Sequence, residues 1–357
     1  FGTGGRSFQA IWKSLKNLMF IIGAALNLRI AVMSGRKIYN FALIGAGRMG
    51  ARWAEVLKMS KSLNVLAIAD KNLPDAKKLS LQFKNCEAFS DPRRLLRMKN
   101  IDAVVIAVPH KFLAPLSIEA LEAGKHVFSE KPAGVSSREL AEAVKVAKKR
   151  NLRYMVGFNH RFHPSYLLAK KLVQAKKIGE ILFIRAKYGF GGRLGYEKEW
   201  RQNKNFSGGG ELLDQGVHMI DMCRMFLGNF TSVSGFAENL YWKSSVDDNA
   251  FLILKNRERQ IASIHVSWTN WDAVHNFEIY GTLGYIRIQG LGNAPYGYGK
   301  EKLTLGLRSK NYFDAPKEKE FLCGADRNQS LVKELQEFVS AISERRAPRP
   351  SGEDAYQ

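Results

Sequence analysis

The sequence predicts an α/β domain with a doubly wound parallel sheet, followed by an α+β domain with a large open antiparallel sheet. Apolar runs typical of buried strands alternate with amphipathic helices from residue 37 to about residue 157. After that point, strand patterns come to follow one another without intervening helices. The length of 357 residues suits two domains of ordinary size.

Each element of the first domain follows from its local pattern. Continuous apolar runs predict buried strands at 38–45, 64–70, 101–109, 125–132 and 153–159. Amphipathic segments predict helices at 48–60, 73–83, 114–124 and 136–151, with Gly124 ending the third and a serine capping the fourth. Strands alternating with helices of this length indicate a Rossmann-type parallel sheet.

The second domain is predicted to begin with a helix near 164–176. A strand at 180–190, a glycine-rich aromatic loop at 189–210 and a helix through 211–221 follow. Further strands are predicted at 230–242, 247–255, 260–270, 275–281 and 284–290, and a last amphipathic helix at 330–344. The segment Gly281 to Gly284 has the composition of a hairpin turn. These patterns give a Rossmann-type domain at 37–157 and an α+β domain at 158–357.

Residues 1–36 are interpreted as a non-native or disordered extension. The short apolar run at 18–26 follows three basic residues, and a membrane-proximal leader is the alternative. The run is too short to span a bilayer, so no membrane association is predicted.

The chain carries 55 Lys and Arg against 33 Asp and Glu, a net charge of +22. An anionic partner and a solvated basic surface both fit this charge. The basic residues are scattered along amphipathic segments and no nucleic-acid-binding module is recognised, which favours the solvated surface. The three cysteines, Cys86, Cys223 and Cys323, form no disulfide framework, which predicts a reducing, cytoplasmic location.

The segment "GAGRMG", residues 45–50, has the G-x-G-x-x-G pattern between a predicted strand and a predicted helix. Gly45 would allow the tight turn, Gly47 the close approach of a pyrophosphate, and Gly50 close packing of helix and strand. Asp70 ends the second strand, where a carboxylate holds the ribose hydroxyls and favours NAD over NADP. Lys71 beside it weakens that preference, and an ordinary glycine turn is the alternative.

The segment "SEKPAG" places Glu130 and Lys131 at the carboxyl end of a strand, the edge of a parallel sheet where ligands bind. A lysine there can donate to a substrate oxygen, with Pro132 fixing the turn. A solvated lysine before a loop is the alternative interpretation.

The segment "GGGELLDQGVHMID", residues 208–221, puts Asp214, His218 and Asp221 at i, i+4 and i+7, on one face of an otherwise apolar helix. Two such residues could ligate a metal, but no glutamate follows His218 and no third ligand is evident, so no metal is predicted. By itself, His218 could equally be a core histidine.

Polar and aromatic residues elsewhere are candidate substrate contacts. Asn159 and Arg161 follow the last Rossmann strand and would either face the cleft or form a domain-junction salt bridge, whereas His160 and His163 are interpreted as structural. The loop at 189–210 offers side chains suited to sugar stacking or phosphate binding, although a plain surface loop also fits. The residues on or beside this loop are Tyr188, Arg193, Tyr196, Trp200 and Arg201.

Taken together, "GAGRMG", "AVPH" with "EAGKHVFSEKP", "GFNHRFHP" and "GGGELLDQGVHMID" resemble, in order and spacing, the Gfo/Idh/MocA oxidoreductase family from about Lys37 onward. The resemblance implies an NAD(P)-dependent dehydrogenase acting on CH–OH groups of a sugar, cyclitol or nucleotide sugar. The segments "GGRLGYEKEW" and "DDNAF" look most like members found with nucleotide-sugar genes. The resemblance also implies a homodimer or homotetramer paired through the outer face of the antiparallel sheet.

The resemblance assigns catalytic roles to Lys131 and His218. His218 would take the hydroxyl proton as the substrate carbon gives hydride to nicotinamide, Lys131 would stabilise the developing alkoxide and share the proton relay, and Asp214 would orient or tune the His218 imidazole. Expected cofactor contacts are Gly45, Gly47, Arg48, Met49, Gly50, Asp70, Lys71, Val108, Pro109, His110, Glu130 and Lys131. Expected substrate contacts are Asn159, Arg161, Tyr188, Arg193, Trp200, Asp214 and His218.

Two features depart from the family pattern. A histidine is usual at the position of Leu113, while here His110 follows Pro109 directly. The chain also stops at "SGEDAYQ", where a further helix is usual, so it looks truncated. A non-catalytic NAD(P)-binding sensor or scaffold is the alternative function, and a nucleic-acid-binding protein is a third class.

Overall fold

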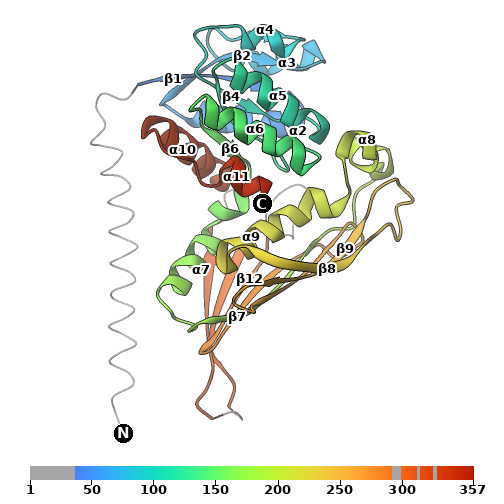
Figure 1. Cartoon of the computed structure of the whole chain (residues 1–357), viewed down its shortest axis with the longest axis vertical. Helices are drawn as coiled ribbons and strands as arrows, with labels where there is room; N and C mark the ends of the chain where they lie inside the picture. The colour runs from blue at the N-terminus through green and yellow to red at the C-terminus, as the bar shows by residue number, and fades with distance from the viewer. Residues whose placement is uncertain (1–36, 292–298, 312–313, 325–327) are drawn as a thin grey trace. The chain divides into compact units, whose positions relative to one another are not determined.

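The structure, a computed structural model, describes residues 37–291, 299–311, 314–324 and 328–357. The predicted extension at 1–36 therefore lies outside the described residues. By their contacts, residues 40–357 form one compact unit, in which two sheets can be followed (Figure 1).

Among the described residues, the first sheet has six strands in the order β3-β2-β1-β4-β5-β6. The pairs β2–β3, β1–β4, β4–β5 and β5–β6 are parallel, which confirms the predicted Rossmann sheet. The strands are β1 (Tyr39–Ile44), β2 (Leu63–Ala69), β3 (Glu87–Phe89), β4 (Ala103–Ile106), β5 (His126–Ser129) and β6 (Tyr154–Val156). The strand order reverses at β1 and β4, and ligands bind such sheets at the carboxyl ends of the strands beside this point.

Helices connect these strands because parallel neighbours need a crossover connection, and the apolar faces of the helices cover the sheet. The two central strands are buried throughout their apolar stretches, as the continuous runs predicted. The connecting helices are α2 (Arg48–Met59), α3 (Leu73–Ser80), α4 (Pro92–Leu96), α5 (His110–Glu122) and α6 (Ser137–Lys149). The short β3 and α4 between α3 and β4 were not predicted, because they are too short to show a period.

The second sheet has eight strands among the described residues, in the order β14-β13-β12-β11-β7-β10-β9-β8. All neighbouring pairs are antiparallel except β7 and β10, which run parallel. The strands are β7 (Ile181–Gly189), β8 (Phe230–Glu238), β9 (Asn249–Asn256), β10 (Ile261–Ser267), β11 (Val274–Gly281), β12 (Gly284–Gln289), β13 (Glu301–Leu307) and β14 (Lys317–Cys323). The predicted large second sheet is thus confirmed. It is mixed rather than wholly antiparallel, and it also contains β13 and β14, which were not predicted.

One face of this sheet is covered by two helices, α7 (Pro164–Gln174) and α9 (Val217–Leu227). Tyr166 of α7 and Met219 and Met222 of α9 pack with Ile184 and Ile264 of the sheet in one buried core. The opposite face carries exposed apolar side chains, which are Phe236, Phe251, Ile253 and Ile261. The hairpin predicted at Gly281 to Gly284 joins β11 to β12.

The last two helices, α10 (Gln329–Ser343) and α11 (Gly352–Tyr356), return to the Rossmann domain (Figure 1). Helix α10 contacts α2 and the 3₁₀ turn η1 (Asn159–Phe162), and α11 contacts α6 and β6. Met155 of β6 also pairs with Ser351. The last two helices of the segment 158–357 therefore pack on the first domain, across the boundary that was predicted at residue 157.

No helix in the described ranges is both long and apolar enough to span a membrane.

Candidate active site at the carboxyl edge of the Rossmann sheet

The glycine loop between β1 and α2 has the geometry that a dinucleotide-binding turn requires. Gly45 has a φ of +105°, and a Cβ there would lie 2.2 Å from the carbonyl oxygen of Ala107. A Cβ on Gly50 would lie 2.0 Å from the carbonyl oxygen of Gly45, so helix and turn pack without room for a side chain. A Cβ on Gly47 would meet nothing within 4 Å. Gly47 thus borders open space, where a pyrophosphate can approach the start of the helix.

Asp70 lies against this loop. Its Oδ2 accepts the Ala46 N–H at 2.7 Å and its Oδ1 accepts the Asn72 N–H at 2.8 Å. Each carboxylate oxygen keeps a lone pair, so Asp70 can still accept from ribose hydroxyls. The neighbouring Lys71 is exposed.

The other expected cofactor residues surround the same edge. Arg48 and Met49 begin α2, and Val108 lies beside Gly45, with its Cγ1 3.2 Å from where a Gly45 Cβ would be. Pro109 precedes α5 directly. Glu130 accepts the indole N–H of Trp53 at 2.8 Å, so this carboxyl group is held against α2.

Lys131 and Asp214 form the centre of the site. Lys131 follows β5, and its peptide bond to Pro132 is cis. Asp214 belongs to a π-helical turn, η4 (Leu212–Gly216), at the start of α9. The Lys131 ammonium donates to Asp214 Oδ1 at 2.5 Å and also to the Asp214 carbonyl oxygen. Lys131 from the first domain is therefore joined directly to the glycine-run motif of the second.

Asp214 has a second cationic partner, Arg201, whose Nε donates to Oδ2 at 3.0 Å. Burial alone would raise the pKa of Asp214, but the charges of Lys131 and Arg201 hold it well below its usual range. His110 Nε2 lies 3.7 Å from Asp214 Oδ1, and burial lowers the pKa of His110 to about 4. Asp214 is thus an ionised carboxylate between two cations and a neutral imidazole.

His218 lies one turn further along, and it is 4 % exposed. Burial, followed by the positive charge of Lys131, lowers the pKa of His218 well below its usual range, so the imidazole is neutral at pH 7. Its Nδ1 is buried without a hydrogen-bond partner among the described residues. A neutral imidazole beside an ammonium group can accept a proton from a substrate hydroxyl.

Asp214 does not hydrogen-bond His218 in the described part of the chain, in contrast to the orienting role expected for it. The π-helical turn is the physical reason, because its wider i→i+5 spacing displaces Asp214 and His218 from the α-helical i, i+4 alignment. The Asp214 carboxylate is turned to Lys131 and Arg201 instead.

The structure also assigns a structural contact to Arg161 and Asp221. Arg161 donates from Nε and Nη2 to Asp221 at 2.8 and 2.5 Å, and from Nη2 to Asp354 at 3.2 Å. This is the domain-junction salt bridge that was one of the two interpretations of Arg161 from the sequence. Asn159 is buried beside Ser330 of α10, at 3.4 Å between Nδ2 and Oγ.

The loop at 189–210 brings some of its residues to the site. Trp200 packs edge-on against His110, with ring centroids 4.8 Å apart, and the Arg201 guanidinium lies over the Trp200 ring. Arg193 instead forms a two-point ion pair with Glu199. Tyr188, on β7, lies beside His160, and the His160 ring stacks on His218.

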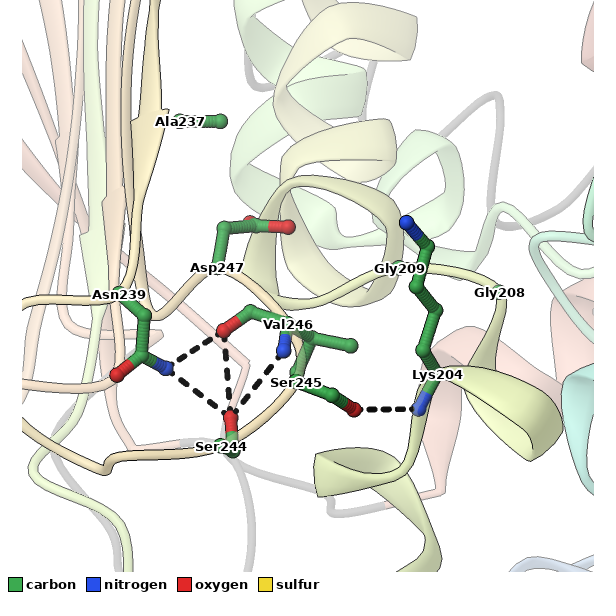
Figure 2. Close-up of a pocket in the computed structure, with 9 residues that line it drawn as sticks. All are labelled: Lys204, Gly208, Gly209, Ala237, Asn239, Ser244, Ser245, Val246 and Asp247. Carbon is green, nitrogen blue, oxygen red and sulfur yellow. Dashed lines mark hydrogen bonds between the residues drawn. The ribbon is translucent and has the colours of Figure 1, made fainter.

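A separate cavity of about 360 Å³ opens beside the glycine run (Figure 2). Figure 2 shows Lys204 extending past Gly209 on one side, and Asn239 with Ser244 on the other. Its lining residues are Lys204, Gly208, Gly209, Ala237, Asn239, Ser244, Ser245, Val246 and Asp247. Neither Lys131 nor His218 lines it. Among the described residues, no three His, Cys, Asp or Glu side chains are grouped so as to hold a metal ion.

Two family models match the chain. Residues 39–158 match the oxidoreductase family with an NAD-binding Rossmann fold, and residues 166–287 match the GFO/IDH/MocA C-terminal domain. The chain belongs to the Gfo/Idh/MocA oxidoreductase family. It is an oxidoreductase with an NAD-binding Rossmann domain.

Named relatives span nearly the whole chain. A levoglucosan dehydrogenase from Pseudarthrobacter phenanthrenivorans is 28 % identical over 89 % of this chain and 93 % of its own. A myo-inositol 2-dehydrogenase from Thermotoga maritima is 26 % identical over 88 % of this chain and 91 % of its own. A solved levoglucosan dehydrogenase complex with NADH and L-sorbose superposes with a TM-score of 0.79 at 25 % identity, covering 89 % of this chain and 93 % of that one.

Sequence reasoning named Arg201 and Tyr196 only as candidate contacts on the loop, and it missed Glu211. Arg201 is the second partner of Asp214. Glu211 is completely buried near Asp214 and Lys131, and its position inside the glycine-run motif was the available signal. Tyr196 is also completely buried and close to Asp214 and Glu211.

Proposed function

We propose that this protein transfers hydride between a nicotinamide cofactor and a secondary alcohol of a sugar, cyclitol or nucleotide sugar. The observation that carries the proposal is the direct contact of Lys131 with Asp214, one helical turn from a buried neutral His218. It places an ammonium group and a proton acceptor together at the carboxyl edge of the Rossmann sheet, where this fold holds its cofactor.

The chain supplies binding groups for that cofactor. The loop from Gly45 to Gly50 would receive the pyrophosphate, because Gly47 borders open space and α2 begins there. Asp70 would accept from the ribose hydroxyls. When bound, the nicotinamide ring would supply the hydride acceptor or donor.

His218 would act as the general base, because its imidazole is neutral and only Nε2 is left to meet a substrate hydroxyl. Lys131 would donate a hydrogen bond to the substrate oxygen as negative charge develops on it. Asp214 would hold the ammonium group in place, rather than orient His218. In oxidation the hydroxyl proton passes to His218, and in reduction His218 returns it to the new hydroxyl.

The substrate class follows from the side chains that approach this centre. Trp200 contributes an aromatic ring against His110 with the Arg201 guanidinium over it, and Tyr188 contributes a phenol beside His160, which stacks on His218. Aromatic faces with flanking hydrogen-bonding groups suit a polyhydroxylated ring. The relatives named for levoglucosan and myo-inositol support the same class.

A homodimer or homotetramer is also proposed, through the uncovered face of the eight-stranded sheet. Phe236 is 75 % exposed and Phe251 and Ile253 are each 49 % exposed, on neighbouring strands. A contiguous apolar surface of this kind is typical of a subunit interface. Sedimentation analysis of the wild type and of Phe251→Asp tests it, since a wild-type monomer would reject it.

The cytoplasm is the proposed location. Cys86, Cys223 and Cys323 are all free thiols in the structure, as expected in a reducing compartment.

The deciding experiment measures absorbance at the NADH band with a panel of sugars, cyclitols and nucleotide sugars, using NAD and NADP separately. On the substrate that reacts, Lys131→Met and His218→Gln should each lower kcat by roughly 10²–10⁴-fold. Lys148→Met is the matched control, because this lysine is 71 % exposed on α6. Tight cofactor binding without turnover of any substrate would instead indicate the sensor or scaffold alternative.

A further inference from the structure

A second buried histidine packs face to face on His218. The ring centroids of His160 and His218 are 4.2 Å apart and the ring planes differ by only 10°. His160 is completely buried and lies in η1, directly after the last Rossmann strand. The imidazole proposed as general base therefore rests against a side chain from the turn at the junction of the two domains.

No hydrogen bond among the described residues fixes the plane of the His218 ring. Its Nδ1 is buried without a partner, and the nearest carboxylate, Asp214, is occupied by Lys131 and Arg201. The χ2 rotation of histidine is intrinsically broad, so an imidazole without such a bond needs packing to hold its orientation. A hydrogen bond at the second ring nitrogen usually does this in catalytic histidines.

His160 is itself held on several sides. His163 packs at right angles to it at 5.5 Å between centroids, and Tyr188 and His275 lie at 5.4 and 5.8 Å. The Nδ1 atom of His163 lies 2.7 Å from Oε1 of the buried Glu301. The face presented to His218 is thus part of a packed aromatic cluster and not a mobile surface group.

We propose that His160 is the positioning residue of the active site, and that its stacked ring sets the orientation in which His218 meets the substrate hydroxyl. This inference rests on the proposed function of His218 as the base. Stacking replaces the carboxylate hydrogen bond that the π-helical turn directs away from His218. The role is carried by the shape of the ring, so another flat aromatic side chain should fill it.

The test uses the full-length protein with its histidine Cε1 atoms labelled with ¹³C, in the presence of NAD. The chain has seven histidines, few enough to assign the His218 signal by its loss in His218→Gln. We expect one sharp His218 resonance in the wild type and in His160→Phe. In His160→Leu it should broaden or split, because the ring samples more than one orientation. If the leucine variant does not fold, His160→Gln, which is close in volume, gives the same comparison.

Kinetics on the reacting substrate provide the second readout. His160→Leu should lower kcat by roughly tenfold or more with little change in KM, and His160→Phe should restore most of it. His265→Leu is the matched control, because it removes a histidine whose ring is also stacked, on Phe251 at 4.1 Å between centroids, outside the cluster around His160, and it should leave kcat and the His218 resonance unchanged. A sharp, unshifted His218 resonance in His160→Leu, or a kcat equal to that of the control, overturns the proposal. Absence of turnover in the wild type would reject the proposed function, while the resonance still decides the positioning role.

Discussion

The salt bridge between Arg161 and Asp221 offers a direct test of how the two domains are held together. Both side chains are buried, at 15 % and 3 % exposure, and two hydrogen bonds of 2.8 and 2.5 Å join them. Asp221→Asn removes the negative charge while keeping the size of the side chain. It leaves Arg161 with a single carboxylate, Asp354, at 3.2 Å.

The expected loss of stability can be estimated from this geometry. Removing one partner of a buried ion pair costs about 3–5 kcal/mol, because the remaining charge is left without compensation. Asp354 retains part of that compensation, so the lower end, about 3 kcal/mol, is expected for Asp221→Asn. The Arg161 guanidinium remains charged in either case: burial lowers its pKa, but the carboxylates around it outweigh burial and raise it.

Urea denaturation at pH 7, followed by circular dichroism, measures this change as a difference in the free energy of unfolding. Glu353→Gln is the control, since its pair with Lys148 has a similar distance, 2.7 Å, but is largely exposed, and it should cost less than about 1 kcal/mol. KM for the reacting substrate should not change. A loss below about 1 kcal/mol in Asp221→Asn, or a large rise in KM with unchanged stability, would refute the structural assignment and return Arg161 to the substrate site.

Three further predictions follow from single side chains. Gly47→Ala should leave stability within about 0.5 kcal/mol but weaken cofactor binding measured by calorimetry, whereas Gly50→Ala should lose about 1–3 kcal/mol of stability through overpacking. Equal stability of these two variants would contradict the geometry of the loop. Burial, followed by the charge of Glu130, raises the pKa of Glu334 well above its usual value, so its stabilising contribution is full below about pH 4.3 and is lost as pH rises through the folded-state pKa. Glu334→Gln should therefore be more stable than the wild type in thermal melts at pH 8.5, and an identical pH dependence would count against this. Burial, followed by the charge of Asp214, raises the pKa of Glu211 well above its usual value, so Glu211 is neutral at pH 7 and Glu211→Gln should keep most of the wild-type kcat. Abolished activity in that variant would show that the ionised form is needed.

The Rossmann half could be predicted closely because its signals are local. Continuous apolar runs mark strands that are buried on both faces, and the spacing of Gly45, Gly47 and Gly50 marks a turn that excludes a Cβ at Gly45 and Gly50 and leaves open space at Gly47. The position of Lys131 at a strand end follows from the same pattern. These features depend on residues that are close in the sequence, so they can be predicted without the structure.

The strand pairing of the second domain could be predicted less well from the sequence, for a physical reason. A parallel pairing such as β7 with β10 joins segments more than seventy residues apart, and nothing in either strand specifies its neighbour. Strand β14 lies at the edge of the sheet, where weaker apolar patterns suffice, and β13 lies next to it. The return of α10 and α11 to the first domain is likewise a matter of which surfaces fit, not of local pattern.

By itself, the sequence determined the family resemblance, the dinucleotide-binding loop and the identity of Lys131, Asp214 and His218 as site candidates. Only the tertiary structure decided how they are connected. The π-helical turn directs the Asp214 carboxylate to Lys131 and Arg201, and His160 rather than Asp214 packs on His218. Helical spacing describes an ideal helix, whereas the partner of a buried charge depends on which cations the rest of the fold brings within hydrogen-bond reach.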